Sequence, residues 1–181
     1  MSGRVIRLSG IQPQAWKNGG GRTRELWRVP SVGALTLRIS VADVGASGPF
    51  SIFPGLDRSI SVLSGEGFRL DGQGFTATVL PGGDPFEFRG DVPVECTLLD
   101  GPVRDVNVMW ARGGARWCPA RRREGCLAGG GFLVALGDGV VVGMAGRGVE
   151  QHLSAGDTVI VEPGEVMEFF GEALVGEAPR P

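Results

Sequence analysis

The stretch LSAGDTVIVEPG at residues 153–164 decides the fold. A Gly-Asp pair, a short run of β-branched residues and a Pro-Gly pair predict a turn, a buried strand and a second turn. A related stretch, LPGGD at residues 80–84, lies about 73 residues earlier, and the hairpin signals VLSGEG (62–67) and ALGDG (135–139) have the same offset. Two signals repeated at one offset indicate two copies of a single β-unit.

Alternation with a period of two dominates the rest of the chain. Leu37, Ile39 and Val41 fall on one face of a predicted strand, and Arg38 and Ser40 fall on the other. No convincing amphipathic helix interrupts these strands. The sequence therefore predicts an all-β protein.

Composition excludes several classes of partner. The 181 residues carry 18 basic and 20 acidic side chains, for a net charge of −2. Because no basic stripe is present, we expect neither a nucleic acid nor a membrane as partner. The three cysteines cannot pair evenly, which is typical of a reduced cytoplasmic protein. The sequence leaves monomer and homodimer open.

The repeat suggests a division of the chain into lobes. We expect an N-terminal lobe over 1–112 that contains the ligand pocket, a linker over 113–130, and a mainly structural C-terminal lobe over 131–181. The linker contains Pro119 and the run Arg121-Arg122-Arg123. That run offers an anion site, but a solvated linker is the favoured interpretation.

The stretch at residues 153–164 also resembles the second half-motif of the cupins. The resemblance implies a bicupin, with two double-stranded β-helix barrels and a pocket in a barrel mouth. Many cupins hold a metal through several histidines, whereas His152 is the single histidine of this chain. Arg58 and Met167 align near positions where metal ligands would stand, so we expect no metal and no other cofactor.

Four segments carry unusual polar density: WKNGGGRTRELW (16–27), RIS (38–40), GPFSIFPGLDR (48–58) and GPVRDVNVM (101–109). Lys17 is the only lysine beside 17 arginines, so its place in the first segment stands out. Each segment also has an ordinary interpretation: Asp57 and Arg58 as a surface ion pair, or Asp105 and Asn107 as turn caps. Taken together, the segments predict one pocket for a small anion.

In this order and spacing, the four segments resemble the HutD/Ves family. The resemblance implies a bicupin that regulates histidine utilisation without catalysis, by binding an intermediate such as N-formylglutamate, formiminoglutamate or urocanate. Lys17, Arg38 and Arg58 would hold carboxylates, and Glu25 would accept a formyl or formimino N–H. The complete set of candidate binding residues is Lys17, Asn18, Thr23, Glu25, Arg38, Ser40, Phe50, Ser51, Phe53, Arg58 and Asn107.

Two other functions stay open from the residues alone. One is a metal-independent cupin enzyme, an isomerase or lyase for a small carboxylic acid, with Lys17 or Glu25 as general acid or base. The other is an interaction module whose Gly-rich loops form a partner surface. A binder returns its ligand unchanged, an enzyme transforms it, and an interaction module has no affinity for it.

Overall fold

The computed structural model describes residues 4–31, 34–114, 117–144 and 150–178. These residues form β-strands and one short 3-10 turn, η1 (Leu8–Gly10), so the all-β prediction is confirmed. The chain divides into two compact units, Ile11–Arg116 and a second unit that joins Met1–Gly10 to Trp117–Pro181. Within the described ranges, no helix has the length and apolarity needed to cross a lipid bilayer.

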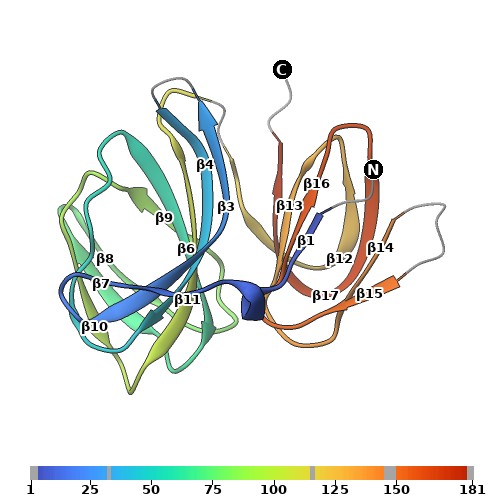
Figure 1. Ribbon diagram of the computed structural model, residues 1–181. Coiled ribbons are helices and arrows are strands. Elements are labelled where there is room, and N and C mark those ends of the chain that lie inside the picture. Colours follow the sequence, from blue (N-terminus) through green and yellow to red (C-terminus); the bar gives the residue numbers. More distant parts are fainter. Residues whose placement is uncertain (1–3, 32–33, 115–116, 145–149, 179–181) are drawn as a thin grey trace. The chain divides into compact units, whose positions relative to one another are not determined.

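The unit Ile11–Arg116 consists of two antiparallel sheets, and Figure 1 shows β7, β8 and β10 across from β3, β4 and β6. The larger sheet has the order β2 (Gln14–Ala15), β3 (Gly21–Ser31), β4 (Ala34–Val44), β11 (Val103–Ala111), β6 (Leu56–Ser64), β9 (Phe86–Arg89). The smaller sheet has the order β5 (Gly48–Pro49), β10 (Val94–Leu98), β7 (Phe68–Gly72), β8 (Phe75–Val79). Side chains from both sheets meet in one apolar cluster that includes Ile60, Phe68 and Val94. This cluster fills part of the barrel interior.

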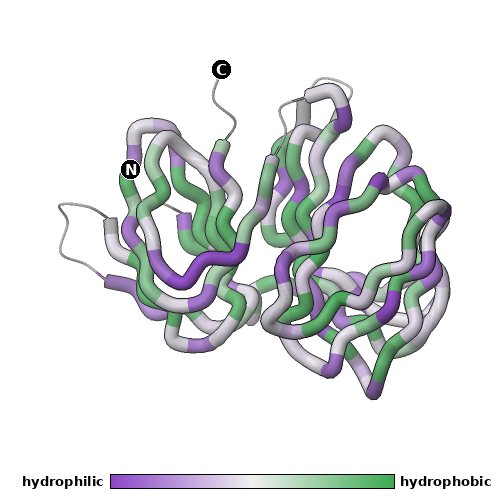
Figure 2. Tube along the Cα trace, turned by 180° about the vertical axis from the view of Figure 1, so that it is seen from behind, coloured by the Kyte–Doolittle hydropathy of each residue, from purple (hydrophilic) through white to green (hydrophobic). Residues whose placement is uncertain are grey.

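The second unit is one seven-stranded sheet. Its main path is β1 (Arg4–Ile6), β16 (Thr158–Val161), β13 (Gly131–Ala135), β17 (Val166–Glu177), β14 (Val140–Met144), β15 (Glu150–Leu153), and β12 (Ala120–Ala128) pairs with β17. Strands β13 and β16 are buried along their whole length, whereas β12 is largely exposed. Figure 2, which colours the trace by hydropathy, shows that hydrophobic and hydrophilic segments alternate along the chain.

Strand pairing confirms the internal repeat. In the first unit, β6 pairs with β9 and β11, while β7 pairs with β8 and β10. In the second unit, β13 pairs with β16 and the end of β17, while β14 pairs with β15 and the start of β17. The repeated sequence signals therefore mark equivalent turns: the hairpin signals follow β6 and β13, and the Gly-Asp turns precede β9 and β16.

The structure corrects the predicted lobe boundaries. The first strand, β1, belongs to the second unit because it pairs with β16. The expected linker over 113–130 contains β12, which pairs with β17. This strand is largely exposed, so its sequence does not need the alternation of polar and apolar residues by which the other strands were predicted. Its Arg121, Arg122 and Arg123 form ion pairs with glutamates of β17. Residues 115 and 116 of the expected linker lie outside the described residues.

The Gly-Asp turn that identified the fold also anchors the first strand. Asp157 is buried, and its carboxylate accepts hydrogen bonds from the backbone N–H of Leu8 (2.9 Å) and of Ser154 (3.1 Å). Arg7 Nη1 donates to the same carboxylate at 2.8 Å. One side chain thus closes the turn before β16 and fixes the segment that follows β1.

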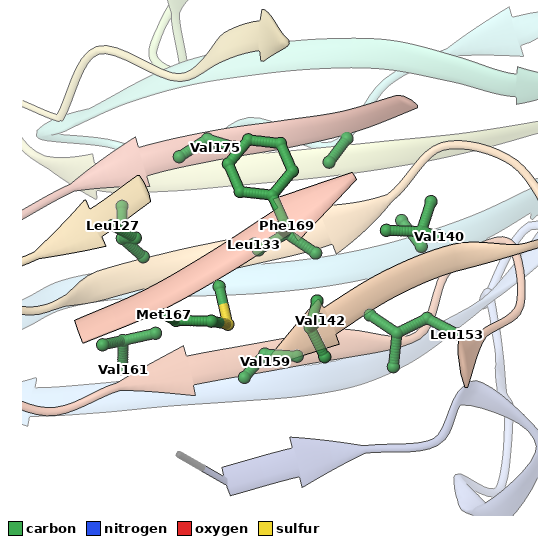
Figure 3. Packing of buried hydrophobic residues seen from close by; sticks show 12 residues of the cluster. Leu127, Leu133, Val140, Val142, Leu153, Val159, Val161, Met167, Phe169 and Val175 are labelled. Carbon is green, nitrogen blue, oxygen red and sulfur yellow. The ribbon is translucent and has the colours of Figure 1, made fainter. Parts of the chain in front are cut away.

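Hydrocarbon side chains fill the interior of the second unit. Figure 3 shows Met167 and Phe169 of β17 in a cluster with Val142 and Val159. Met167, which aligns with a cupin metal ligand, has no exposed surface. A closely packed apolar interior contributes to the stability of the unit.

Met167→Ala should therefore lower the free energy of unfolding by roughly 2–5 kcal/mol, because it removes buried methylene groups and leaves a cavity. The neighbouring Val166 is 38% exposed, so Val166→Ala is a matched control expected to change stability by less than about 1 kcal/mol. Chemical denaturation of both variants measures the difference. Equal effects of the two substitutions would contradict the packing described for Met167.

Candidate functional site

A cavity of about 540 Å³ lies in the unit Ile11–Arg116. Every candidate binding residue predicted from the sequence except Glu25 lines it: Lys17, Asn18, Thr23, Arg38, Ser40, Phe50, Ser51, Phe53, Arg58 and Asn107. The cavity is also lined by residues that the sequence reasoning did not select: Gln14, Ala15, Trp16, Ala42, Pro49, Asp105 and Met109. Four separate sequence segments thus meet at one place, while their binding role stays a prediction.

Register in the larger sheet places the polar side chains together. Ser40 on β4 pairs with Asn107 on β11, and two residues along, Arg38 pairs with Met109. Met109 in turn pairs with Arg58 on β6. Since alternate residues of a strand face the same side, these three strands present their polar positions to the same interior. The alternation predicted around Arg38 and Ser40 is confirmed.

Arg58 is the most deeply buried cation at the cavity. Its residue is 5% exposed, and its guanidinium lies over the rings of Phe50, Phe53 and Phe88 at 5.4, 5.3 and 4.8 Å from their centroids. Nη2 donates to Asn107 Oδ1 at 2.6 Å. Burial lowers the pKa of Arg58 to about 10, so the group is still charged at neutral pH. Its Nε–H has no hydrogen-bond acceptor within the described residues.

The alternative interpretation of Asp57 and Arg58 as a surface ion pair is wrong. Adjacent residues of a strand point to opposite faces, so only Arg58 enters the barrel. Asp57 instead accepts a hydrogen bond from Arg112 Nε at 2.9 Å.

Asp105 is the functional candidate that the sequence reasoning noticed without selecting. It lies two residues before Asn107 on β11, and its carboxyl accepts a hydrogen bond from Asn107 Nδ2 through Oδ1. Burial raises the pKa of Asp105 to about 7, although the positive charge of Arg58 opposes the shift. Its Oδ2 has no partner in the part of the chain that the structure describes. Asp105 and Asn107 are two residues apart on one strand, so their side chains lie on the same face. This spacing was the signal that could have identified Asp105.

Asn107 connects the two buried charged groups. Its carbonyl oxygen accepts from Arg58 and its amide nitrogen donates to Asp105, so both ends of the side chain are engaged. These two contacts fix which way the amide points. Arg58, Asn107 and Asp105 consequently form one hydrogen-bonded chain along the cavity wall.

Glu25 is a counter-ion of two arginines and does not line the cavity. Arg38 Nε donates to Glu25 Oε2 at 2.7 Å, and Arg28 donates to both carboxylate oxygens. Burial works in the opposite direction, but these hydrogen bonds leave the pKa of Glu25 below its ordinary value. Glu25 therefore orients Arg38, which lies 5.9 Å from the Phe53 ring centroid, and does not contact the cavity itself.

The Gly-rich loop has a defined conformation. Trp16 N donates to Gly21 O at 2.9 Å, and Trp16 Nε1 donates to Thr23 Oγ1 at 2.7 Å. Gly21 is required because a Cβ there would lie 2.5 Å from the carbonyl oxygen of Asp43. Lys17 is exposed at the cavity and forms no ion pair within the described residues. The loop thus presents one uncompensated ammonium group at the cavity.

Comparison with known proteins finds a family whose model matches most of the chain. The HutD family model matches residues 9–174, which extends well beyond the four polar segments. An uncharacterised 21.2 kDa protein in the hutC 3′ region of Pseudomonas putida is 37% identical over 153 residues, covering 81% of this chain and 80% of that protein. Protein Ves of Citrobacter koseri is 37% identical over 99 residues, which cover 54% of this chain and 52% of Ves.

Solved structures share the complete fold. A conserved protein of unknown function from Pseudomonas aeruginosa PAO1 has a TM-score of 0.83 and 31% identity, and the match covers 99% of this chain and 100% of that one. HutD from Pseudomonas fluorescens SBW25, in a formate condition, has a TM-score of 0.80 and 29% identity at the same coverage. Oxalate decarboxylase from Lactobacillus farciminis has a TM-score of 0.68 at 9% identity, covering 99% of this chain and 87% of that one. The bicupin prediction is confirmed.

The raised pKa of Asp105 predicts a specific dependence of stability on pH. The folded chain holds this proton up to about pH 7, whereas the ordinary carboxyl pKa is 3.8. The stabilisation is complete below about pH 4 and is lost as pH rises to 7, at up to about 1.4 kcal/mol per pH unit. Asp105→Asn cannot titrate, so its stability should rise relative to wild type across this range.

Denaturant unfolding at several pH values between 4 and 8 measures the difference. Asp71→Asn, a change to a surface carboxylate on β7, is the control and should follow the wild-type pH dependence. Parallel curves for wild type and Asp105→Asn would show that Asp105 ionises in the folded protein as it does in the unfolded chain.

Proposed function

The chain belongs to the HutD family, and from that membership we propose that it is a non-enzymatic binding protein for a small anionic intermediate of histidine degradation. Binding of N-formylglutamate, formiminoglutamate or urocanate would regulate histidine utilisation. The Pseudomonas putida relative named for the hutC 3′ region supports the connection to hut genes.

The observation that carries the proposal is the buried guanidinium of Arg58 at the cavity. A buried cation is costly unless an opposite charge and hydrogen-bond acceptors compensate it. Its Nη2 is engaged by Asn107, but its Nε–H lacks an acceptor within the described residues. A ligand carboxylate would supply that acceptor and would add its negative charge to that of Asp105.

The rest of the lining supports a ligand with more than one anionic group. Arg38 is held in place by Glu25, and Lys17 adds a further cation without an ion-pair partner in the described ranges. Phe50 and Phe53 offer an apolar wall for the carbon chain between the charged ends. Three cations and two rings fit a short dicarboxylate better than a phosphate, whose oxygens radiate from one atom.

Asp105 provides the observation that favours a second candidate, a metal-independent cupin enzyme acting on a small carboxylic acid. A carboxyl whose pKa lies near 7 is suited to proton transfer. Glu25 is less suited to that role because two arginines hold it in its ionised form. In this alternative the ligand is consumed, whereas in the favoured one it is recovered unchanged.

The proposal includes a cytoplasmic location, which agrees with the free thiols of Cys96, Cys118 and Cys126. Monomer and homodimer both remain compatible with it, since the proposed ligand contacts lie within a single unit of one chain.

Calorimetric titration of N-formylglutamate, formiminoglutamate and urocanate tests the proposal, with formate as the simplest carboxylate. Arg58→Met should weaken the binding of the preferred ligand about 10- to 150-fold, the effect of losing one charge-assisted hydrogen bond. Arg58→Lys should bind more weakly than wild type because an ammonium cannot reproduce the planar guanidinium.

Arg69→Met is the matched control, since Arg69 pairs with Asp71 on the surface of β7 and does not line the cavity. It should bind like wild type. NMR of the ligand after long incubation separates the two candidates, because an enzyme changes its spectrum. Wild type without affinity for any of these compounds, or equal affinities of wild type and Arg58→Met, would refute the pocket as described.

A further inference from the structure

Asp105 is a buried carboxyl with one oxygen hydrogen-bonded and the other buried without a hydrogen-bond partner among the described residues. Asn107 Nδ2 donates to Oδ1, and Oδ2 has no partner among the described residues. The residue is 1% exposed, yet it lines the cavity together with Arg58 and Arg38. Because Oδ1 already accepts a hydrogen bond, the free position for a proton is Oδ2. A protonated Asp105 would thus offer an O–H donor at the same cavity as the Arg58 guanidinium.

The charges that act on Asp105 come from the two strands that pair with β11. Arg58 on β6 favours its ionised form, and Asp43 on β4 disfavours it. Asp43 itself is ionised, since hydrogen bonds from Arg104, Arg24 and Arg22 outweigh its burial and lower its pKa to about 2. Cys96 on β10 carries no charge near pH 7, since burial raises the pKa of its thiol to about 12. Arg58 is therefore the cation that stabilises the ionised form of Asp105.

An incoming anion changes this balance. Its carboxylate would take over as the counter-charge of Arg58, and two ionised carboxylates would then share a poorly solvated site. Like charges in such a site raise the pKa of one partner until it takes up a proton. Asp105 is the partner that takes it, because its pKa is already about 7 whereas that of a free carboxylate ligand is near 4.

We infer that Asp105 is a specificity-determining residue that binds an anionic ligand as a proton donor: a carboxylate enters together with one proton from solvent, which Asp105 Oδ2 holds and donates to a ligand oxygen. The inference rests on the proposed function, because it needs a carboxylate at this cavity. It assigns the ligand a carboxylate oxygen within reach of both Arg58 and Asp105. No covalent bond forms or breaks apart from the O–H bond made by proton uptake.

The test is titration of wild type with N-formylglutamate between pH 5.5 and 8.5, where the carboxylates of that compound stay ionised. The dissociation constant should be constant below about pH 6.5 and should rise about tenfold per pH unit above pH 7. Repeating the titration at pH 7 in two buffers of different ionisation enthalpy should reveal an uptake of about half a proton, increasing toward one at pH 8. This measurement needs no variant.

Asp105→Asn supplies the decisive comparison. The Asn107 donation fixes the oxygen of the new amide at the Oδ1 position, so an N–H takes the place of the proposed O–H. The variant should bind without pH dependence or proton uptake, and at pH 8.5 it should bind more than tenfold more tightly than wild type. His152→Gln, which removes the only histidine of the chain on β15 of the other unit, should retain the wild-type pH dependence.

The outcomes separate this inference from the proposed function. Binding by wild type with a constant affinity and no proton uptake would overturn the role of Asp105 and leave the anion pocket intact. Weaker binding by Asp105→Asn at pH 8.5 than by wild type would also overturn it, because the ionised carboxylate would then be the form that binds. Absence of binding at every pH, with the fold verified by unfolding, would reject the pocket and the inference together.

Discussion

A guanidinium buried inside a β-barrel imposes the requirements that the rest of the site satisfies. Arg58 needs acceptors, opposite charge and contacts for its flat faces. Asn107 accepts from Nη2, Asp105 supplies negative charge, and three phenylalanine rings surround the guanidinium. The Nε–H of Arg58 has no hydrogen-bond acceptor among the described residues, and a ligand carboxylate would provide one.

The two units show how one strand topology supports different interiors. Equivalent strands pair in the same way in both. Strands β4, β6 and β11 direct Ser40, Arg58 and Asn107 to a cavity that lies in the same unit as an apolar cluster, whereas β13, β14 and β17 turn hydrocarbon inward. The apolar interior is compact and buries residues such as Met167 completely. A polar interior cannot close in this way, because its charges require space for partners. The cavity and the packed core are thus alternative solutions of one fold.

Two carboxyl groups associated with the cavity arginines differ in how strongly their ionised forms are stabilised. Glu25 accepts hydrogen bonds from Arg28 and Arg38, which lower its pKa and keep it ionised. It therefore remains a counter-ion that orients Arg38. Asp105 receives one neutral hydrogen bond and is fully buried, so its charge is only marginally stable near neutral pH. A carboxyl group can therefore be a fixed counter-ion or a titrating group, depending on how many cationic donors reach it.

The sequence by itself determined the all-β class, the internal repeat, the alternation around Arg38 and Ser40, and most of the residues that line the cavity. These features are local, because turn chemistry and period-two alternation depend only on near neighbours in the chain. Tertiary structure decided what depends on distant partners. Pairing placed β1 in the second unit and made a strand of the Arg-rich segment expected to be a linker. It also paired Glu25 with Arg38, and it buried Asp105 within the electrostatic influence of Arg58 with Oδ2 lacking a hydrogen-bond partner among the described residues, since burial and charge pairing arise only when separate strands meet.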